Sequence, residues 1–259
     1  AGQTSFLDDL FSQTEANGED SENSSYGRPN RKLKMSKAEK LQLEKELLGF
    51  YISGHPLDAF GSLPASMNEL QTEDLPNLPH RTAFRLCGVV TGLNKRFTRN
   101  DNKPWAMFTL STRRQGFNMH MFSKAYETSG EALLEDQIVT VQGYIANRDG
   151  DVRLNVQEVL PLDRQLPQLV KSITWYLKDS TERVDFLKHV RKALDDRPGD
   201  TVVSFALINS DGTALRVETA TSLRLHLTQD VLHQLNQHPA VAGTGFDLAK
   251  MPVYDKNIF

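Results

Sequence analysis

The stretch from residue 85 to residue 160 constrains the fold most, because apolar and polar side chains alternate there with a period of two. This alternation predicts five strands, at Arg85–Leu93, Trp105–Leu110, Phe117–Phe122, Ile138–Ile145 and Val152–Leu160. A helical patch at about Lys124–Leu134 separates the third strand from the fourth. Between the last two strands, Asn147–Gly150 predicts a hairpin turn, because its glycine tolerates a positive φ angle.

Five strands with a helix between the third and the fourth follow the order of an OB fold, a small and partly open barrel. A second set of periodic segments, after residue 167, predicts a small α+β domain. Its expected elements are a strand at Ser172–Leu177, a helix at Thr181–Asp195, hairpin strands at Thr201–Ile208 and Ala214–Glu218, and a helix at Thr228–Gln237. In the first helix, one stripe contains Val184, Leu187, Val190 (or Arg191) and Leu194. Residues 240–259 contain too much Gly, Ala and Pro to be assigned.

We therefore expect a mainly β, α+β chain in four parts. Residues 1–35 form a flexible tail, 36–82 a helix with a turn and a connector, 83–163 the barrel, and 164–259 the second domain. Residues 13–34 of the tail have too little apolar surface to offset the entropy of ordering. The chain begins Ala-Gly without Met, which indicates a fragment or a processed chain.

Bulk composition limits the possible functions. The net charge of -3 over 259 residues argues against a protein that coats nucleic acid indiscriminately, so such binding would need a local patch. Cys87, the only cysteine, excludes an internal disulfide, and its place in a predicted strand favours a buried, small apolar side chain. The sequence contains neither a run of about 18 apolar residues nor a signal peptide, so we expect a cytoplasmic protein without a membrane partner.

Cationic side chains gather in the first half of the predicted barrel, with aromatic rings between them. Cations neutralise phosphates and exposed rings stack on bases, so this combination predicts binding of single-stranded DNA. The predicted contacts are Arg85, Lys95, Arg96, Phe97, Arg99, Lys103, Trp105, Phe108, Arg113 and Arg114, with Arg148 on the opposing hairpin. Trp105 and Phe108 point to opposite sides of their strand, so at most one of them stacks. The alternative is a solvated basic surface without a ligand.

A helix and a tight turn precede the barrel. Ser36-Lys-Ala-Glu39 is a capping box that opens the helix, and Gly54 and Pro56 forbid its continuation, so we expect it to end near Phe50 to Ser53. His55 lies in the turn, where we expect a hydrogen bond to the backbone rather than a metal or catalytic role. His233 and His238 lie five residues apart and do not share a helical face, so we expect no metal site. The acidic residues are scattered along linker, helices and turns and do not converge on metal ions, so we expect no catalytic residue.

Residues 44–58 read Glu-Lys-Glu-Leu-Leu-Gly-Phe-Tyr-Ile-Ser-Gly-His-Pro-Leu-Asp. This stretch closely resembles a signature of the alpha subunit of bacterial DNA polymerase III, whose residues here are Gly49, Phe50, Tyr51, Ser53, Gly54, His55, Pro56 and Leu57. The resemblance runs from Gly2 to Asp163, and more weakly to Gln237, and covers only the C-terminal part of such a polymerase. It implies a parent enzyme that uses Mg²⁺ as a DNA-directed DNA polymerase, and a fragment with no cofactor and no catalysis of its own.

The same resemblance implies partners. Gln3, Phe6 and Leu7 resemble the internal motif that binds the sliding clamp (beta), and Asp8-Asp-Leu-Phe11 offers an alternative frame. The C-terminal segment resembles the region that binds the tau subunit of the clamp loader. With single-stranded DNA and the rest of the polymerase chain, these are the expected partners. Two alternatives are a protein-interaction scaffold whose barrel binds no nucleic acid, and a fragment of another OB-containing enzyme, such as a nuclease or a tRNA synthetase.

Overall fold

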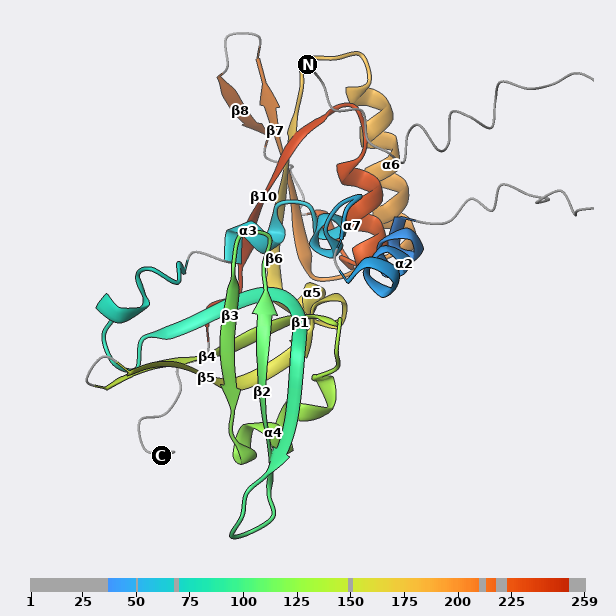
Figure 1. Ribbon diagram of the computed structural model, residues 1–259. Coiled ribbons are helices and arrows are strands. Elements are labelled where there is room, and N and C mark those ends of the chain that lie inside the picture. Colours follow the sequence, from blue (N-terminus) through green and yellow to red (C-terminus); the bar gives the residue numbers. More distant parts are fainter. Residues whose placement is uncertain are drawn as a thin grey trace, which may run out of the picture. The chain divides into compact units, whose positions relative to one another are not determined.

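A computed structural model describes residues 37–49, 51–67, 70–148, 151–209, 213–217 and 223–251 (Figure 1). The predicted clamp motif, the linker, Ser36 and Phe50 lie outside these residues. The described part contains a barrel, a second sheet, and short helices that precede the barrel.

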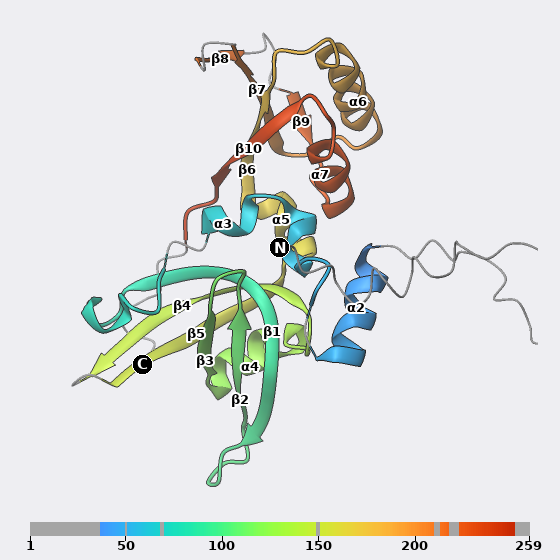
Figure 2. The ribbon, with the colours of Figure 1, turned by 45° about the horizontal axis from the view of Figure 1, so that its top comes forward.

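The barrel has the predicted strands. They are β1 (Ala83–Phe97), β2 (Pro104–Ser111), β3 (Gly116–Met121), β4 (Ile138–Arg148) and β5 (Asp151–Pro161). Helix α4 (Ser123–Ser129) and the short 3-10 helix η3 (Gly130–Ala132) connect β3 to β4. The sheet closes in the order β1-β2-β3-β5-β4, with β3 and β5 parallel (Figure 2). This is the connectivity of an OB fold, so the predicted fold class is confirmed.

Alternation along the strands fills the barrel. Ala106, Phe108 and Leu110 of β2 are buried, and the residues between them are partly exposed. Two close approaches require glycine. A Cβ atom on Gly88 would lie 2.7 Å from the carbonyl oxygen of Ser111, and one on Gly143 would lie 2.0 Å from that of Asn155.

The helix before the barrel, α2 (Lys37–Leu48), ends earlier than predicted, because Gly49 adopts a left-handed φ of 83°. Glu44 of this helix binds the next segment. Its carboxylate accepts hydrogen bonds from the amides of Ile52 (2.9 Å) and Ser53 (2.8 Å) and from the Ser53 hydroxyl. These hydrogen bonds lower the pKa of Glu44. Glu44 therefore connects the helix to the turn that follows it.

His55 caps the 3-10 helix η1 (Pro56–Phe60), which confirms its predicted backbone hydrogen bond. Its Nδ1 accepts from the Leu57 amide (3.2 Å), and its own amide donates to the Asp58 carboxylate (3.0 Å). Partial burial lowers the pKa of His55, although the neighbouring Asp58 acts in the opposite direction. Two further short helices, α3 (Leu63–Met67) and η2 (Leu75–Asn77), lead to β1.

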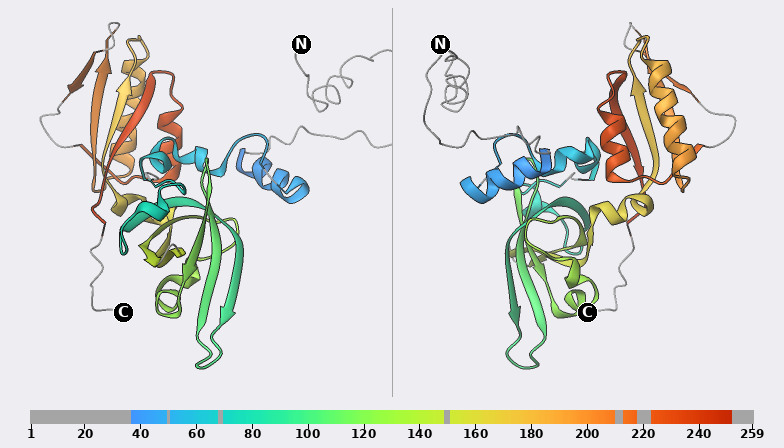
Figure 3. Two further views of the ribbon diagram at one scale, coloured as in Figure 1. Left: turned by 60° about the vertical axis from the view of Figure 1, so that its left-hand side comes forward. Right: turned by 90° about the vertical axis from the view of Figure 1, so that its right-hand side faces the viewer.

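The second sheet has the order β10-β6-β7-β8, with β9 also paired to β7. Its elements are α5 (Leu162–Leu169), β6 (Val170–Leu177), α6 (Arg183–Asp196), β7 (Thr201–Ile208), β8 (Ala214–Val217), β9 (Leu223–Leu225), α7 (Gln229–Asn236) and β10 (Val241–Leu248). Strands β6 and β7 are parallel, and α6 forms the crossover between them. Figure 3 shows α6 and α7 on the same face of the sheet.

Three features of this region depart from expectation. The unassigned residues 241–248 form β10, which pairs with β6 along its length. The proline-containing segment at 162–169 forms α5. The apolar stripe of α6 is also displaced. Phe186 and Val190 are buried, whereas Val184 and Leu187 are exposed, because the helix turns the Phe186 side toward Trp175 and Phe205.

One hydrophobic core joins the turn, the barrel wall and the second sheet. Leu57 and Phe60 of η1 pack in the same cluster as Cys87 of β1 and Trp175 of β6. Cys87 is fully buried, as predicted, and burial raises the pKa of its thiol. Among the described residues, none of the helices combines the length and the apolar character that crossing a bilayer requires.

Candidate nucleic-acid interface

The β1–β2 hairpin carries most of the predicted DNA contacts. Strand pairing continues to its tip, where Arg96 is opposite Trp105 and Phe97 is opposite Pro104. In Figure 1 this hairpin extends beyond the rest of the barrel. It brings together six predicted residues, which we call the hairpin cluster: Lys95, Arg96, Phe97, Arg99, Lys103 and Trp105.

The cluster combines charge with an accessible ring. Phe97 is 63% exposed, and Lys95, Arg96, Arg99 and Lys103 are also exposed. The Arg96 guanidinium lies over the Trp105 ring, 5.9 Å from its centroid, and its Nε donates to the Asn94 side chain (3.1 Å). This arrangement can neutralise phosphates and offers Phe97 as a surface for a base.

Hydrogen bonds shape the tip of the hairpin. The Thr98 hydroxyl accepts from the Lys103 amide (2.8 Å) and is hydrogen-bonded to Asp101. The bond from Thr98 and the charge of Lys103 lower the pKa of Asp101. Lys103 Nζ lies 3.6 Å from the Asp101 carboxylate, so the positive charge of Lys103 is partly offset. Within the described residues, neither Arg99 nor Lys95 forms an ion pair with an acidic side chain.

Two predicted residues, Phe108 and Arg85, have contacts within the fold. Phe108 is 3% exposed and packs in the barrel core, so its ring has no surface for a base. Arg85 is hydrogen-bonded to the backbone that follows β10. It donates to the carbonyl oxygens of Ala249 (2.6 Å) and Lys250 (3.3 Å). The prediction for Phe108 is therefore wrong. The contact predicted for Arg85 stays a prediction, because its guanidinium is only partly buried.

Arg113 and Arg114 lie in the β2–β3 turn, at the other end of β2 from Lys103. The length of β2 separates the two sites by roughly 24 Å. Arg113 forms an ion pair with Asp58 of η1 (2.6 Å). The structure therefore does not bring these two arginines into the hairpin cluster. The backbone of Arg148 ends β4, opposite Asp151, but its side chain lies outside the described part.

A cavity of about 430 Å³ opens at the β4–β5 end of the barrel. Its lining residues are His80, Arg81, Phe122, Tyr144, Ala146, Asp151, Arg153 and Asn155. None of them was among the predicted contacts. Once the strands are known, alternation places Tyr144, Arg153 and Asn155 on the side of the sheet that faces away from the barrel core. Arg81 and Phe122 come to the same cavity only because the barrel closes.

Strand register connects the cavity to the hairpin cluster. Met107 is opposite His120, His120 is beside Asn155, and Asn155 is opposite Tyr144. Trp105 lies two residues before Met107, and therefore on the same side of β2. Burial and the charge of Arg153 lower the pKa of His120, which favours the neutral imidazole. We call this continuous surface the outer barrel surface.

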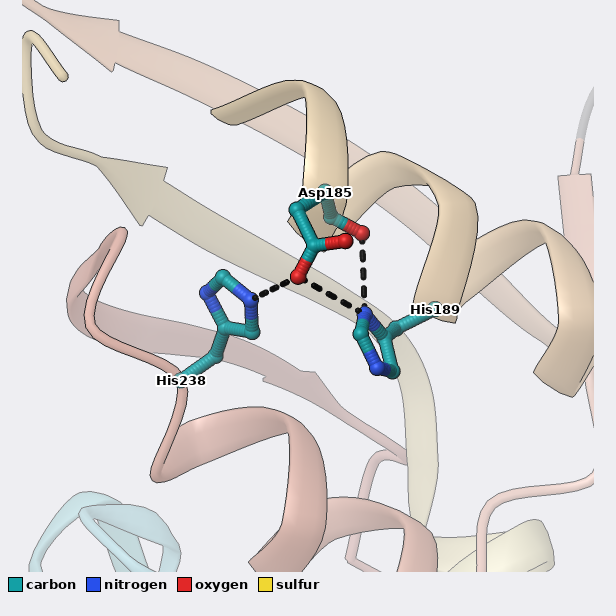
Figure 4. Close-up of side chains that lie close together, drawn as sticks. All are labelled: Asp185, His189 and His238. Atoms are coloured by element: carbon teal, nitrogen blue, oxygen red, sulfur yellow. Dashed lines mark hydrogen bonds and ion pairs between the residues drawn. The ribbon is translucent and has the colours of Figure 1, made fainter. Parts of the chain in front are cut away.

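A third group of polar side chains lies in the second sheet region (Figure 4). Asp185 and His189 of α6 meet His238, which follows α7, and their ligand atoms lie within 4.8 Å of one another. His238 Nε2 lies 3.2 Å from the Asp185 carboxylate, and His189 Nδ1 lies 2.9 Å from the Asp185 carbonyl oxygen. The prediction considered His238 only together with His233, whereas the fold brings Asp185 and His189 of a distant helix beside it.

Hydrogen bonding accounts for this group. His238 Nδ1 accepts from the Ala240 amide (3.2 Å), so its proton is on Nε2 and is donated to Asp185. A metal ion at Nε2 would have to displace that proton and disturb the Ala240 bond. His189 Nδ1 lies at hydrogen-bond distance from the Asp185 carbonyl oxygen, so the Asp185 carboxylate is the one ready ligand of the three, fewer than a structural zinc site needs. We therefore treat the group as a tie between α6 and the end of α7.

Curated relatives of the chain are alpha subunits of DNA polymerase III. The subunit of Mycobacterium leprae is 30% identical over 185 residues, which cover 66% of this chain and 15% of the relative. That of Aquifex aeolicus is 31% identical over 159 residues, or 61% of this chain and 13% of the relative. That of Pseudomonas aeruginosa is 24% identical over 208 residues, or 79% and 17%.

Other comparisons add little. No protein-family model matches the chain. Among solved structures, the mitochondrial single-stranded DNA binding protein Rim1 of S. cerevisiae matches 32% of this chain and 96% of its own, with 16% identity and a TM-score of 0.26. That score is too low to bear on function. The resemblance seen in residues 44–58 is nevertheless confirmed by the curated relatives: the chain is related to the alpha subunits of bacterial DNA polymerase III and corresponds to a C-terminal region that spans less than a fifth of their length.

Proposed function

We propose that this chain binds single-stranded DNA through the hairpin cluster and the outer barrel surface. The observation that carries the proposal is the hairpin cluster itself, where four exposed cations and an exposed Phe97 lie on one hairpin. The net charge of -3 makes this local concentration necessary for binding a polyanion. Stacking on Phe97 would be tolerant of sequence, as a replicative template requires.

Salt dependence of DNA binding tests the proposal. Fluorescence anisotropy with a labelled oligo-dT should give an affinity that falls steeply with salt. Replacing Lys95, Arg99 and Lys103 together by Ala should reduce the magnitude of the log–log slope by about 2, because each lost phosphate contact on a single strand contributes about 0.7. An exposed triple Lys171→Ala, Lys188→Ala and Lys192→Ala in the second sheet region is the matched control. A flat salt response of the unaltered protein would favour a scaffold that binds no nucleic acid.

The remaining parts of the chain are proposed to attach the polymerase to its partners in the cytoplasm. A clamp-binding role for Gln3, Phe6 and Leu7 rests on their motif, in which two apolar anchors enter a pocket and the Gln amide orients them. Replacing all three by Ala should abolish binding to the sliding clamp in surface plasmon resonance. Clamp affinity that survives this change would refute the tether.

A docking role for the second sheet region toward the tau subunit has a structural candidate. Val184 and Leu187 of α6 are exposed apolar side chains beside each other on one helix. Changing both to Asp should remove tau binding in the same assay and leave oligo-dT binding intact. Polymerase chemistry, with its magnesium ions, is proposed to lie in the rest of such a protein, since this chain matches only 13% to 17% of its relatives.

A further inference from the structure

We infer that the cavity at the β4–β5 end of the barrel binds one unpaired base of the DNA strand. The inference rests on the proposed function and assigns it a second contact region, separate from the hairpin cluster. The cavity measures about 430 Å³, within the range of roughly 300–1,000 Å³ that is usual for small-ligand pockets. It lies on the outer barrel surface, which register links to Trp105.

Two aromatic rings line the cavity. Phe122 is 50% exposed, so its ring is accessible from the cavity, and Tyr144 is partly buried on β4. Every base has a π surface, so a ring in this position can stack on any of the four. Phe122 is therefore the side chain that we assign to the stacking contact.

Asn155 supplies a polar contact beside these rings. It is only 7% exposed, and its Oδ1 has no hydrogen-bond partner among the described residues. A buried acceptor without a donor is unfavourable, because it has lost its hydrogen bonds to water. Each of the four bases carries an N–H donor on its Watson–Crick edge, so rotation of the amide toward an entering base would satisfy this oxygen without selecting one base.

Two cationic side chains, Arg81 and Arg153, line the cavity. Arg153 is exposed and forms an ion pair with Asp151 (2.6 Å), and Arg81 is exposed beside the entrance. Arg81 has a positive φ of 69°, a backbone conformation that is strained for a non-glycine residue. Its amide donates to the carbonyl oxygen of Ile145 (2.7 Å), which fixes this backbone next to β4. The two guanidinium groups can contact phosphates on either side of the bound base.

The test compares oligonucleotides that share phosphates and differ in bases. Anisotropy is measured with an oligo-dT of about ten nucleotides and with an abasic oligomer of the same length. For the unaltered chain, oligo-dT should bind more tightly. Phe122→Ala should weaken oligo-dT binding by about fivefold or more and leave abasic binding within twofold, because one stacking contact is lost. Phe122→Trp should keep the preference for bases.

Leu134→Ala is the matched control, since Leu134 is 53% exposed and does not line the cavity. It should leave both affinities unchanged. If the chain binds oligo-dT with a steep salt response but Phe122→Ala has no effect, or weakens both ligands equally, the base site is wrong and the proposed function stands. If the unaltered chain binds neither ligand, both fail. Thermal melting of each variant confirms that it is folded.

Discussion

The two turns at opposite ends of β2 contain similar residues and differ in what those residues contact. The β1–β2 turn presents Arg99 and Lys103 to solvent beside the exposed Phe97. In the β2–β3 turn, Arg113 is paired with Asp58, and the Gln115 side chain bonds to Leu70 and Thr72. Composition cannot separate a ligand surface from a docking contact, because the difference lies in partners that are distant in sequence.

Removing a buried anchor of η1, the helix that Arg113 contacts through Asp58, should have the largest effect on stability. Leu57 is fully buried in the core shared by η1 and the second sheet. Leu57→Ala should lower the free energy of unfolding by about 2–5 kcal/mol, through lost burial and a cavity. Leu47→Ala, at a site that is 72% exposed, is the control and should change stability little. Urea denaturation measures both, and equal effects would contradict this assignment.

Acidification should lower the free energy of unfolding through His55, which caps the same helix η1. Burial lowers its pKa below the ordinary value of 6.5, so the unfolded chain binds a proton more readily. The stabilisation is present above that value and is lost as the pH falls from about 6.5 toward the pKa of the folded state. His55→Asn keeps a capping acceptor without a titrating group, so it should reduce this pH dependence. Identical profiles for the two proteins would contradict the prediction.

Neutralising the β2–β3 turn should separate stability from DNA binding. Arg113→Ala with Arg114→Ala should lower the free energy of unfolding by about 0.5 kcal/mol, because the Asp58 pair is half-exposed. Oligo-dT affinity should remain within about twofold, unlike that of the triple variant of Lys95, Arg99 and Lys103. A larger loss of affinity would place these arginines back in the interface.

The tie between α6 and α7 should give the smallest effect. Asp185 is exposed, so Asp185→Asn should lower the free energy of unfolding by only a few tenths, about 0.3 kcal/mol. Zinc should not raise the Tm of the unaltered chain, since His238 Nε2 is engaged by Asp185. A zinc-dependent rise in Tm that disappears in His189→Ala would show a metal site instead.

Local pattern predicted much of this molecule. Alternation placed the five barrel strands, because one side of each strand faces the core. It also placed Trp105 and Phe108 on opposite sides of β2. It did not find β10, where Gly243 and Gly245 break the period and pairing to β6 decides the structure. Nor did it foresee that the carbonyls of Ala249 and Lys250 bind Arg85, or that closure of the barrel gathers Arg81 and Phe122 around one cavity.

Hydrogen–deuterium exchange with and without oligo-dT tests the central claim most directly, because it locates the bound strand on the unaltered chain. DNA should slow exchange at residues 94–105 of the hairpin and at 118–122 and 153–155 of the outer barrel surface. It should leave the β2–β3 turn at 112–115 unchanged. Protection confined to that turn, or no protection at the hairpin under conditions where DNA is bound, would contradict the account.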